Sequence, residues 1–156
     1  MKKGNVLEIK DLSVDFMTVR GIVYAVQGVD LEVKQGEIHG IVGESGCGKS
    51  TAGRAILRLY EVTGGAIELE GRDIAHLEGR ALRALRPSMQ MIFQDPQASL
   101  NPRMTVGSII AEPLDEHAKL TRAGRRARVM ELMDAVGLNR AFANRYPHEF
   151  SGGQRQ

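Results

Sequence analysis

Residues 43–50, with the sequence GESGCGKS, fit the pattern G-x-x-x-x-G-K-S/T that binds nucleotide phosphates. Glycines allow the backbone N–H groups of such a loop to turn inward around an anion, and the following helix adds the positive end of its dipole. Lys49 would lie in the first turn of that helix, where a cation opposes the dipole unless an anion is close to it. We therefore expect Lys49 to reach the β- and γ-phosphates of a nucleotide and the Ser50 hydroxyl to bind Mg²⁺.

The segments on either side of this loop are those that the phosphate pattern requires. Ile38–Val42 is a short β-branched run typical of a buried strand, and residues 49–60 have apolar side chains at helical spacing. A strand, a glycine loop and a helix in this order disfavour the alternative of an ordinary glycine-rich turn. The expected nucleotide-binding residues of this segment are Gly43, Ser45, Gly46, Cys47, Gly48, Lys49, Ser50 and Thr51.

The rest of the chain has an α/β front half and a helical back half. Short runs of alternating apolar residues are typical of antiparallel strands, whereas apolar residues three and four positions apart are typical of helices. The predicted elements are antiparallel strands within 6–33, a strand at 66–69, a helix at 77–85, a strand at 89–93, and helices at 105–111 and 121–136. Thr121 has the side chain of a good N-cap for the last of these helices.

Length and composition limit the class of protein. The 156 residues give room for one domain of ordinary size, and 42% hydrophobic with 26% charged residues is usual for a folded globular chain. No stretch approaches the ~20 apolar residues that cross a bilayer, and one cysteine cannot form an internal disulfide. The 21 basic and 19 acidic residues leave a net charge of +2, which gives no reason to infer a nucleic-acid partner. We expect a cytoplasmic protein.

Three separated segments together resemble the ATP-binding-cassette (ABC) transporter ATPases. They are the phosphate loop, Gln94 after a predicted strand, and Phe150–Gln154, which has the sequence FSGGQ. Residues 91–106 and 146–150 are similar in particular to the ATPase subunits of oligopeptide and dipeptide importers. The resemblance covers essentially the whole chain. It implies an α/β P-loop NTPase fold with an N-terminal antiparallel β subdomain and the start of an α-helical subdomain.

The same resemblance implies a domain organisation and roles for individual residues. Residues 1–95 would form the nucleotide-binding core with its antiparallel part, and residues 96–156 the helical subdomain. Gln94 would sense the γ-phosphate and its Mg²⁺, close to where the permease subunits in the membrane dock. The signature of one subunit would contact ATP held by a second ABC subunit, and its residues are Ser151, Gly152, Gly153 and Gln154.

The family also places an aromatic side chain against adenine, upstream of the phosphate loop. Phe16 fits that offset best and Tyr24 is the second candidate, although Phe16 equally fits the core of a strand. By resemblance, ATP and Mg²⁺ are the expected cofactors. The protein would lie at the cytoplasmic face of the cell membrane, held there by permease subunits, and the transported substrate is set by other subunits.

After the signature, the family has an apolar strand ending in Asp-Glu and a later histidine. The one Asp-Glu pair of the sequence is Asp115-Glu116, which no apolar strand precedes, so we do not take it for this motif. We therefore expect the N-terminal part of a longer subunit, with an incomplete parallel core sheet, an unpaired strand edge at Ile38–Val42 and no ATP hydrolysis of its own. Alternatives are an ABC ATPase that does not act in transport, and a module that binds nucleotide without turnover.

Overall fold

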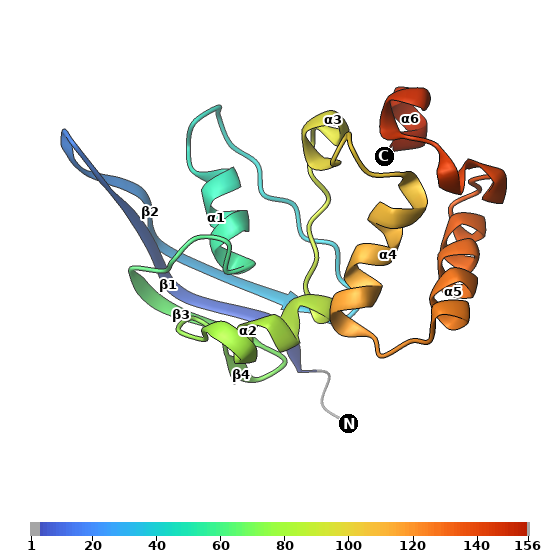
Figure 1. Ribbon diagram of the computed structural model, residues 1–156. Helices are drawn as coiled ribbons and strands as arrows, with labels where there is room; N and C mark the ends of the chain where they lie inside the picture. The colour runs from blue at the N-terminus through green and yellow to red at the C-terminus, as the bar shows by residue number, and fades with distance from the viewer. Residues whose placement is uncertain (1–3, 156) are drawn as a thin grey trace. The chain divides into compact units, whose positions relative to one another are not determined.

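The computed structural model describes residues 4–155, which fall into two compact units, one within residues 1–90 and one within residues 91–156. Figure 1 shows the strands gathered in the first unit, and each unit has its own hydrophobic core. Within the described part of the chain, no helix has both the length and the apolar character needed to cross a bilayer.

The first unit is built on a four-stranded antiparallel sheet in the order β2-β1-β3-β4. The long hairpin of the first two strands is the extended blue ribbon of Figure 1. The antiparallel strands predicted from alternation are confirmed, although the short runs merge into two strands of 14 residues each. The strands are β1 (Asn5–Thr18), β2 (Gly21–Lys34), β3 (Gly64–Leu69) and β4 (Arg72–Asp73).

A break in the register of β1 decides which of its side chains reach the core. Ile9, Leu12 and Val14 are all buried, although strict alternation would place Ile9 and Leu12 on opposite faces. The pairing shifts between Ile9 and Leu12, where Asp11 has a φ of 50°. This irregularity places Ile9 and Leu12 on the same, buried face of the sheet. The Asp11 N–H donates to Asp30 Oδ1 at 2.8 Å, and this hydrogen bond stabilises the backbone at the irregularity.

Helix α1 (Lys49–Ile56) packs its buried residues, Ala52 and Ala55, into the core that the sheet forms. The helix ends earlier than the predicted residue 60, because Arg58 turns into the left-handed region with a φ of 53°. The Arg86 guanidinium donates to the carbonyls of Leu57 and Arg58, which have no partner further along a helix. The unit is completed by α2 (Gly79–Leu85) and the 3₁₀ turn η1 (Arg86–Ser88).

The second unit is helical, with a small core made by Ala111, Val129, Met133 and Ala143. The helix predicted at 105–111 continues through Pro113, and the helix predicted at 121–136 is confirmed within one residue at each end. The elements are α3 (Pro96–Ser99), α4 (Val106–His117), α5 (Arg122–Ala135), η2 (Arg140–Asn144), η3 (Pro147–Glu149) and α6 (Gly152–Arg155).

Two predicted strands are wrong: Ile38–Val42 and Met89–Phe93 have no strand structure, and all paired strands of residues 4–155 are antiparallel. A strand exists only where a neighbour accepts its hydrogen bonds, and no described segment pairs with either run. The predicted strand edge at Ile38–Val42 is therefore not an edge. Its apolar side chains remain outside the core, with Ile38 99% and Val42 94% exposed.

Candidate nucleotide-binding site

The phosphate loop lies between β2 and α1 in the first unit and depends on two glycines in the left-handed region. Gly46 has a φ of 84° and Gly48 a φ of 95°. A Cβ atom on Gly48 would lie 2.5 Å from the carbonyl oxygen of Ala25 in β2, which no side chain could accept. Gly48 thus packs directly against the backbone of β2, and this contact fixes where α1 begins.

Helix α1 begins without the usual capping groups. Gly48 is its N-cap residue and offers no side chain, and the first turn has no acidic residue. The first N–H groups of a helix have no partner within the helix, and here no side-chain oxygen replaces one. An anion at this position would therefore find free N–H donors and the positive end of the dipole.

Lys49 turns back over the loop that precedes it. Its Nζ donates to the carbonyl oxygens of Gly43 at 2.7 Å and Glu44 at 2.5 Å, and lies 3.5 Å from Cys47 Sγ. Both acceptors are neutral carbonyls, and a hydrogen bond from an ammonium group to a charged oxygen is stronger than one to a neutral carbonyl. The ammonium group therefore already lies at the loop, where it can exchange neutral acceptors for charged phosphate oxygens.

The other predicted residues of the loop have the exposure that nucleotide binding requires. Ser45, Gly46, Cys47 and Ser50 are exposed, while Thr51 is partly buried. The described structure gives the Ser50 hydroxyl no hydrogen-bond partner, which fits a residue that would hold Mg²⁺ together with phosphate oxygens. Within residues 4–155 no three His, Cys, Asp or Glu side chains gather as an independent metal site.

The two aromatic candidates for adenine lie on opposite faces of the β1–β2 hairpin. Phe16 pairs with Val23 and Asp15 with Tyr24, so Phe16 and Tyr24 alternate across the sheet. Phe16 packs against the core that contains α1, and its ring meets Tyr60 edge-on with centroids 5.3 Å apart. Tyr24 is 66% exposed on the other face. Only Phe16 thus shares a face with α1.

Gln94 and the signature lie in the second unit, whereas the phosphate loop lies in the first. Gln94 is exposed, in an irregular segment that precedes α3. In the signature, the backbone N–H and the hydroxyl of Ser151 both donate to Gln154 Oε1, at 3.1 and 3.2 Å. The structure therefore brings Ser151, which directly precedes α6, together with Gln154 inside that helix.

The link between Ser151 and Gln154 was not foreseen, although the sequence contains a signal for it. Ser-x-x-Gln is a capping-box pattern, in which the side chain of the fourth residue accepts the backbone N–H of the first. The preceding turn repeats the arrangement, because the Tyr146 N–H donates to Glu149 Oε2 at 2.6 Å. Arg155 joins the two turns by donating to the carbonyls of Pro147 at 2.8 Å and His148 at 3.3 Å.

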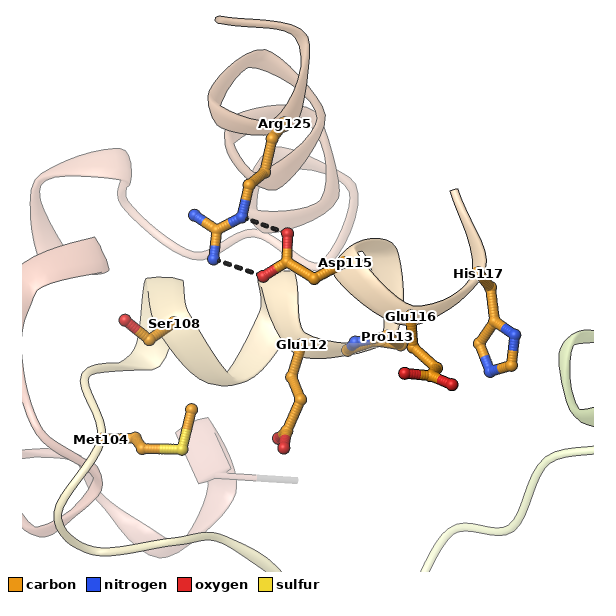
Figure 2. Close-up of a pocket in the computed structure, with 8 residues that line it drawn as sticks. All are labelled: Met104, Ser108, Glu112, Pro113, Asp115, Glu116, His117 and Arg125. Atoms are coloured by element: carbon orange, nitrogen blue, oxygen red, sulfur yellow. Dashed lines mark hydrogen bonds and ion pairs between the residues drawn. The ribbon is translucent and has the colours of Figure 1, made fainter. Parts of the chain in front are cut away.

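The Asp115-Glu116 pair lies inside helix α4, which confirms that it does not end a strand. Asp115 lies beside a hollow of about 640 Å³, and its carboxylate accepts two hydrogen bonds from Arg125, at 2.6 and 2.8 Å (Figure 2). The hydrogen bond and the positive charge of Arg125 lower the pKa of Asp115. Asp115 and Arg125 therefore form an ion pair between α4 and α5.

Comparison with protein families matches one description, "ABC transporter", over residues 26–156. The oligopeptide transport ATP-binding protein OppF of Bacillus subtilis is 57% identical over 153 residues, which cover 96% of this chain and 50% of that protein. The dipeptide transport ATP-binding protein DppF of Lactococcus lactis is 54% identical over 155 residues, covering 97% of this chain and 50% of that protein. The chain thus spans about half the length of the curated relatives it matches.

Solved structures of ABC cassettes are also similar to this chain. The dimeric ATP-binding cassette MJ0796, in a post-hydrolysis state with ADP and Pi bound, matches with a TM-score of 0.81 and 28% identity. The match covers 96% of this chain and 65% of that one. A second structure of the MJ0796 cassette, also dimeric, gives a TM-score of 0.80 at 29% identity, with the same coverage.

Proposed function

The chain belongs to the ABC transporter family, and from this membership we propose that it is the ATP-binding part of the ATPase subunit of a peptide importer. The observation that carries the nucleotide assignment is the start of α1, where glycine replaces a cap and Lys49 stands beside free N–H groups. The names of the relatives support the choice of oligopeptides or dipeptides as the cargo.

The phosphate loop would hold the triphosphate of ATP. In this arrangement Lys49 leaves the carbonyls of Gly43 and Glu44 and donates to β- and γ-phosphate oxygens, while backbone N–H groups of the loop and of α1 surround the anion. Mg²⁺ would be held by the Ser50 hydroxyl, and it would neutralise part of the phosphate charge.

Phe16 is the proposed neighbour of adenine, and Tyr24 is the alternative. The support is that Phe16 lies on the α1 face of the hairpin, whereas Tyr24 lies on the opposite face. An aromatic ring offers a flat apolar surface against which a base can stack.

The remaining proposed contacts are made by Gln94 and by the signature, and only those of the signature involve nucleotide held by another subunit. Gln94 would meet the γ-phosphate and Mg²⁺, and the signature residues Ser151–Gln154 would complete the site of a second ABC subunit. The dimeric state of the MJ0796 cassette supports such a pair. Permease subunits would bind near Gln94 and hold the protein at the cytoplasmic face of the membrane, so ATP-driven closure of the pair would be coupled to transport.

We expect the 156-residue chain to bind ATP with negligible turnover. Positioned general-base catalysis contributes about 10²–10⁴-fold to such reactions, and the one Asp-Glu pair of the sequence is helical and occupied by Arg125. A phosphate-release assay on folded, soluble chain measures this directly. Release as fast as that of a complete ABC ATPase would contradict the expectation and would point to Glu44 or Asp95 as the base.

Calorimetric titrations with ATP and with AMP, both in the presence of Mg²⁺, test the proposed function. If the loop binds β- and γ-phosphates, ATP binds and AMP, which lacks both groups, binds far more weakly. Equal affinities for the two nucleotides would remove the phosphate loop as the recognition element. Absence of any heat from ATP, with the fold verified by circular dichroism, would reject the nucleotide site itself.

A further inference from the structure

We propose that Tyr60 is a positioning residue, which holds the ring of Phe16 in place for adenine without touching the nucleotide itself. Tyr60 lies in the connection between α1 and β3. The inference rests on the proposed function, because Phe16 is assigned there to adenine. It deepens that function by naming the side chain on which the position of the Phe16 ring depends.

The hairpin has only two strands where Phe16 lies. Strand β1 pairs with β3 from Leu7 to Ser13, and beyond Ser13 the described residues give β1 no partner strand other than β2. The last pair before the tip is Thr18 with Gly21, and the tip projects from the sheet (Figure 1). Because a two-stranded ribbon is only marginally stable by itself, a contact from outside the hairpin is needed to fix the Phe16 ring.

Tyr60 supplies such a contact. The centroids of the Phe16 and Tyr60 rings lie 5.3 Å apart, and their planes meet at 87°, which is the edge-to-face geometry that aromatic pairs prefer. Both side chains are partly buried, and Phe16 also packs against the core of the first unit. The Phe16 ring is therefore held from outside the hairpin while part of it remains accessible to a base.

Tyr60 can hold another ring because its own ring and backbone are anchored. The Arg54 guanidinium lies 5.8 Å from the centroid of the Tyr60 ring, and its Nη1 donates to Tyr60 Oη at 3.4 Å. Arg58 donates to the carbonyls of Tyr60 and Ile74, both at 3.1 Å. Since Arg54 belongs to α1, which begins at the phosphate loop, these contacts place the Phe16 ring relative to the proposed phosphate site.

Calorimetric titrations of the chain with ATP and with tripolyphosphate, both with Mg²⁺, test the inference, because only ATP carries a base. Tyr60→Leu removes the supporting ring, and Tyr60→Phe keeps it as the matched control. We expect Tyr60→Leu to weaken ATP binding by about threefold to tenfold, the range that an aromatic pair supports, and to leave tripolyphosphate binding native. Tyr60→Phe should bind both ligands as the native chain does.

The double variant of Tyr60→Leu with Phe16→Leu shows whether Tyr60 acts through Phe16. If it does, Tyr60→Leu adds nothing to the loss of ATP affinity that Phe16→Leu causes alone. Equal losses in the two backgrounds would mean that Tyr60 touches the nucleotide itself, and an equal loss for tripolyphosphate would mean general damage to the fold. Either result overturns the proposal. Native ATP affinity in Tyr60→Leu, with a loss in Phe16→Leu, overturns the proposal and leaves the proposed function standing.

NMR signals of the Phe16 ring protons test the contact without any nucleotide. The magnetic effect of one aromatic ring on another depends on their contact, so Tyr60→Leu should shift these signals and Tyr60→Phe should leave them close to native. Unchanged signals in Tyr60→Leu would overturn the proposal. A native chain that binds no ATP would reject the proposed function, whereas these signals would still decide whether Tyr60 positions the Phe16 ring.

Discussion

Helix α1 of the first unit and helices α4 and α5 of the second begin in different ways. Thr105 caps α4 by accepting the N–H of Ser108 at 3.4 Å, and Thr121 caps α5 by accepting the N–H of Gly124 at 3.2 Å. Helix α1 has Gly48 at the same position and no side-chain cap. A side chain of the preceding residue thus caps α4 and α5, whereas no side chain caps α1.

The comparison also shows which sequence signal is informative. A cation in the first turn opposes the helix dipole, so the position of Lys49 in the sequence indicates a bound anion. Yet α5 begins with Arg122 and has Arg125 in its second turn, although Thr121 caps it. A cation near a helix start is therefore weak evidence, and the missing cap at Gly48 is the stronger observation.

The largest expected effect is the loss of ATP affinity in Lys49→Ala. In the proposed site the lysine would supply a charge-assisted hydrogen bond to phosphate, worth about 1.5–3 kcal/mol, so affinity should fall about 10- to 150-fold. Calorimetry with Mg²⁺ and ATP measures it, and urea unfolding shows that the variant is folded. An unchanged affinity would mean that the uncapped end of α1 binds no phosphate and would remove the contrast with α4 and α5.

A second prediction concerns the glycine that takes the place of the cap. In Gly48→Ala, the Cβ would meet the Ala25 carbonyl and the residue would keep a strained φ of 95°, so we expect a loss of about 1–3 kcal/mol in the free energy of unfolding. Gly53→Ala is the control, since no atom lies within 4 Å of its Cβ position and alanine favours a helix by about 0.5–1 kcal/mol. Urea unfolding of both variants should give changes of opposite sign. Equal changes in the free energy of unfolding would show that the packing of Gly48 against β2 leaves room for a Cβ atom.

The capped helix α5 gives a smaller effect. Thr121→Ala removes the oxygen that accepts the Gly124 N–H and should lower the free energy of unfolding by about 1 kcal/mol, whereas Thr121→Ser retains the hydroxyl and should change it little. Chemical unfolding measures both. ATP affinity should be native in each variant, because Thr121 lies outside the proposed site. A serine variant as unstable as the alanine variant would show that the cap does not act through its oxygen.

Local patterns predicted much of this fold because their physical causes are local. The alternation of apolar residues predicted β1, β2 and β3, and Thr121 marked the start of α5 within one residue. The glycine spacing located the loop before α1, whose backbone angles only glycine tolerates.

The wrong strand at Ile38–Val42 and the end of α1 depend on partners distant in sequence. Ile38–Val42 has the composition of a buried strand, but a strand also needs a neighbour to accept its hydrogen bonds, and composition does not supply one. The carbonyls at the end of α1 accept hydrogen bonds from Arg86, which lies 29 residues after Leu57. The support of Ser151 by Gln154 is local and could have been predicted from the capping-box spacing.

The smallest expected effect is a pH dependence that shows how α5 tolerates its cations. Arg125 is neutralised by Asp115 of α4, which is the role proposed for phosphate beside Lys49 (Figure 2). Because the hydrogen bond from Arg125 lowers the pKa of Asp115 in the folded chain, the stabilising contribution of this pair is present above the pKa of an unfolded aspartate, about 3.9. It is lost as the pH falls through the lowered pKa of the folded state.

An NMR titration of the Asp115 carboxyl tests this pair directly. In Arg125→Gln the pKa of Asp115 should rise toward its ordinary value, because the hydrogen bonds and the positive charge are both weakened or removed. Arg128→Gln is the matched control, since Arg128 lies on the same helix but pairs with Glu131. Both charges of the Asp115–Arg125 pair are exposed to solvent, so the change in stability should be smaller than that of the Thr121 cap. If the pKa of Asp115 is the same in both variants, Arg125 does not neutralise it, and the contrast with Lys49 must rest on the caps alone.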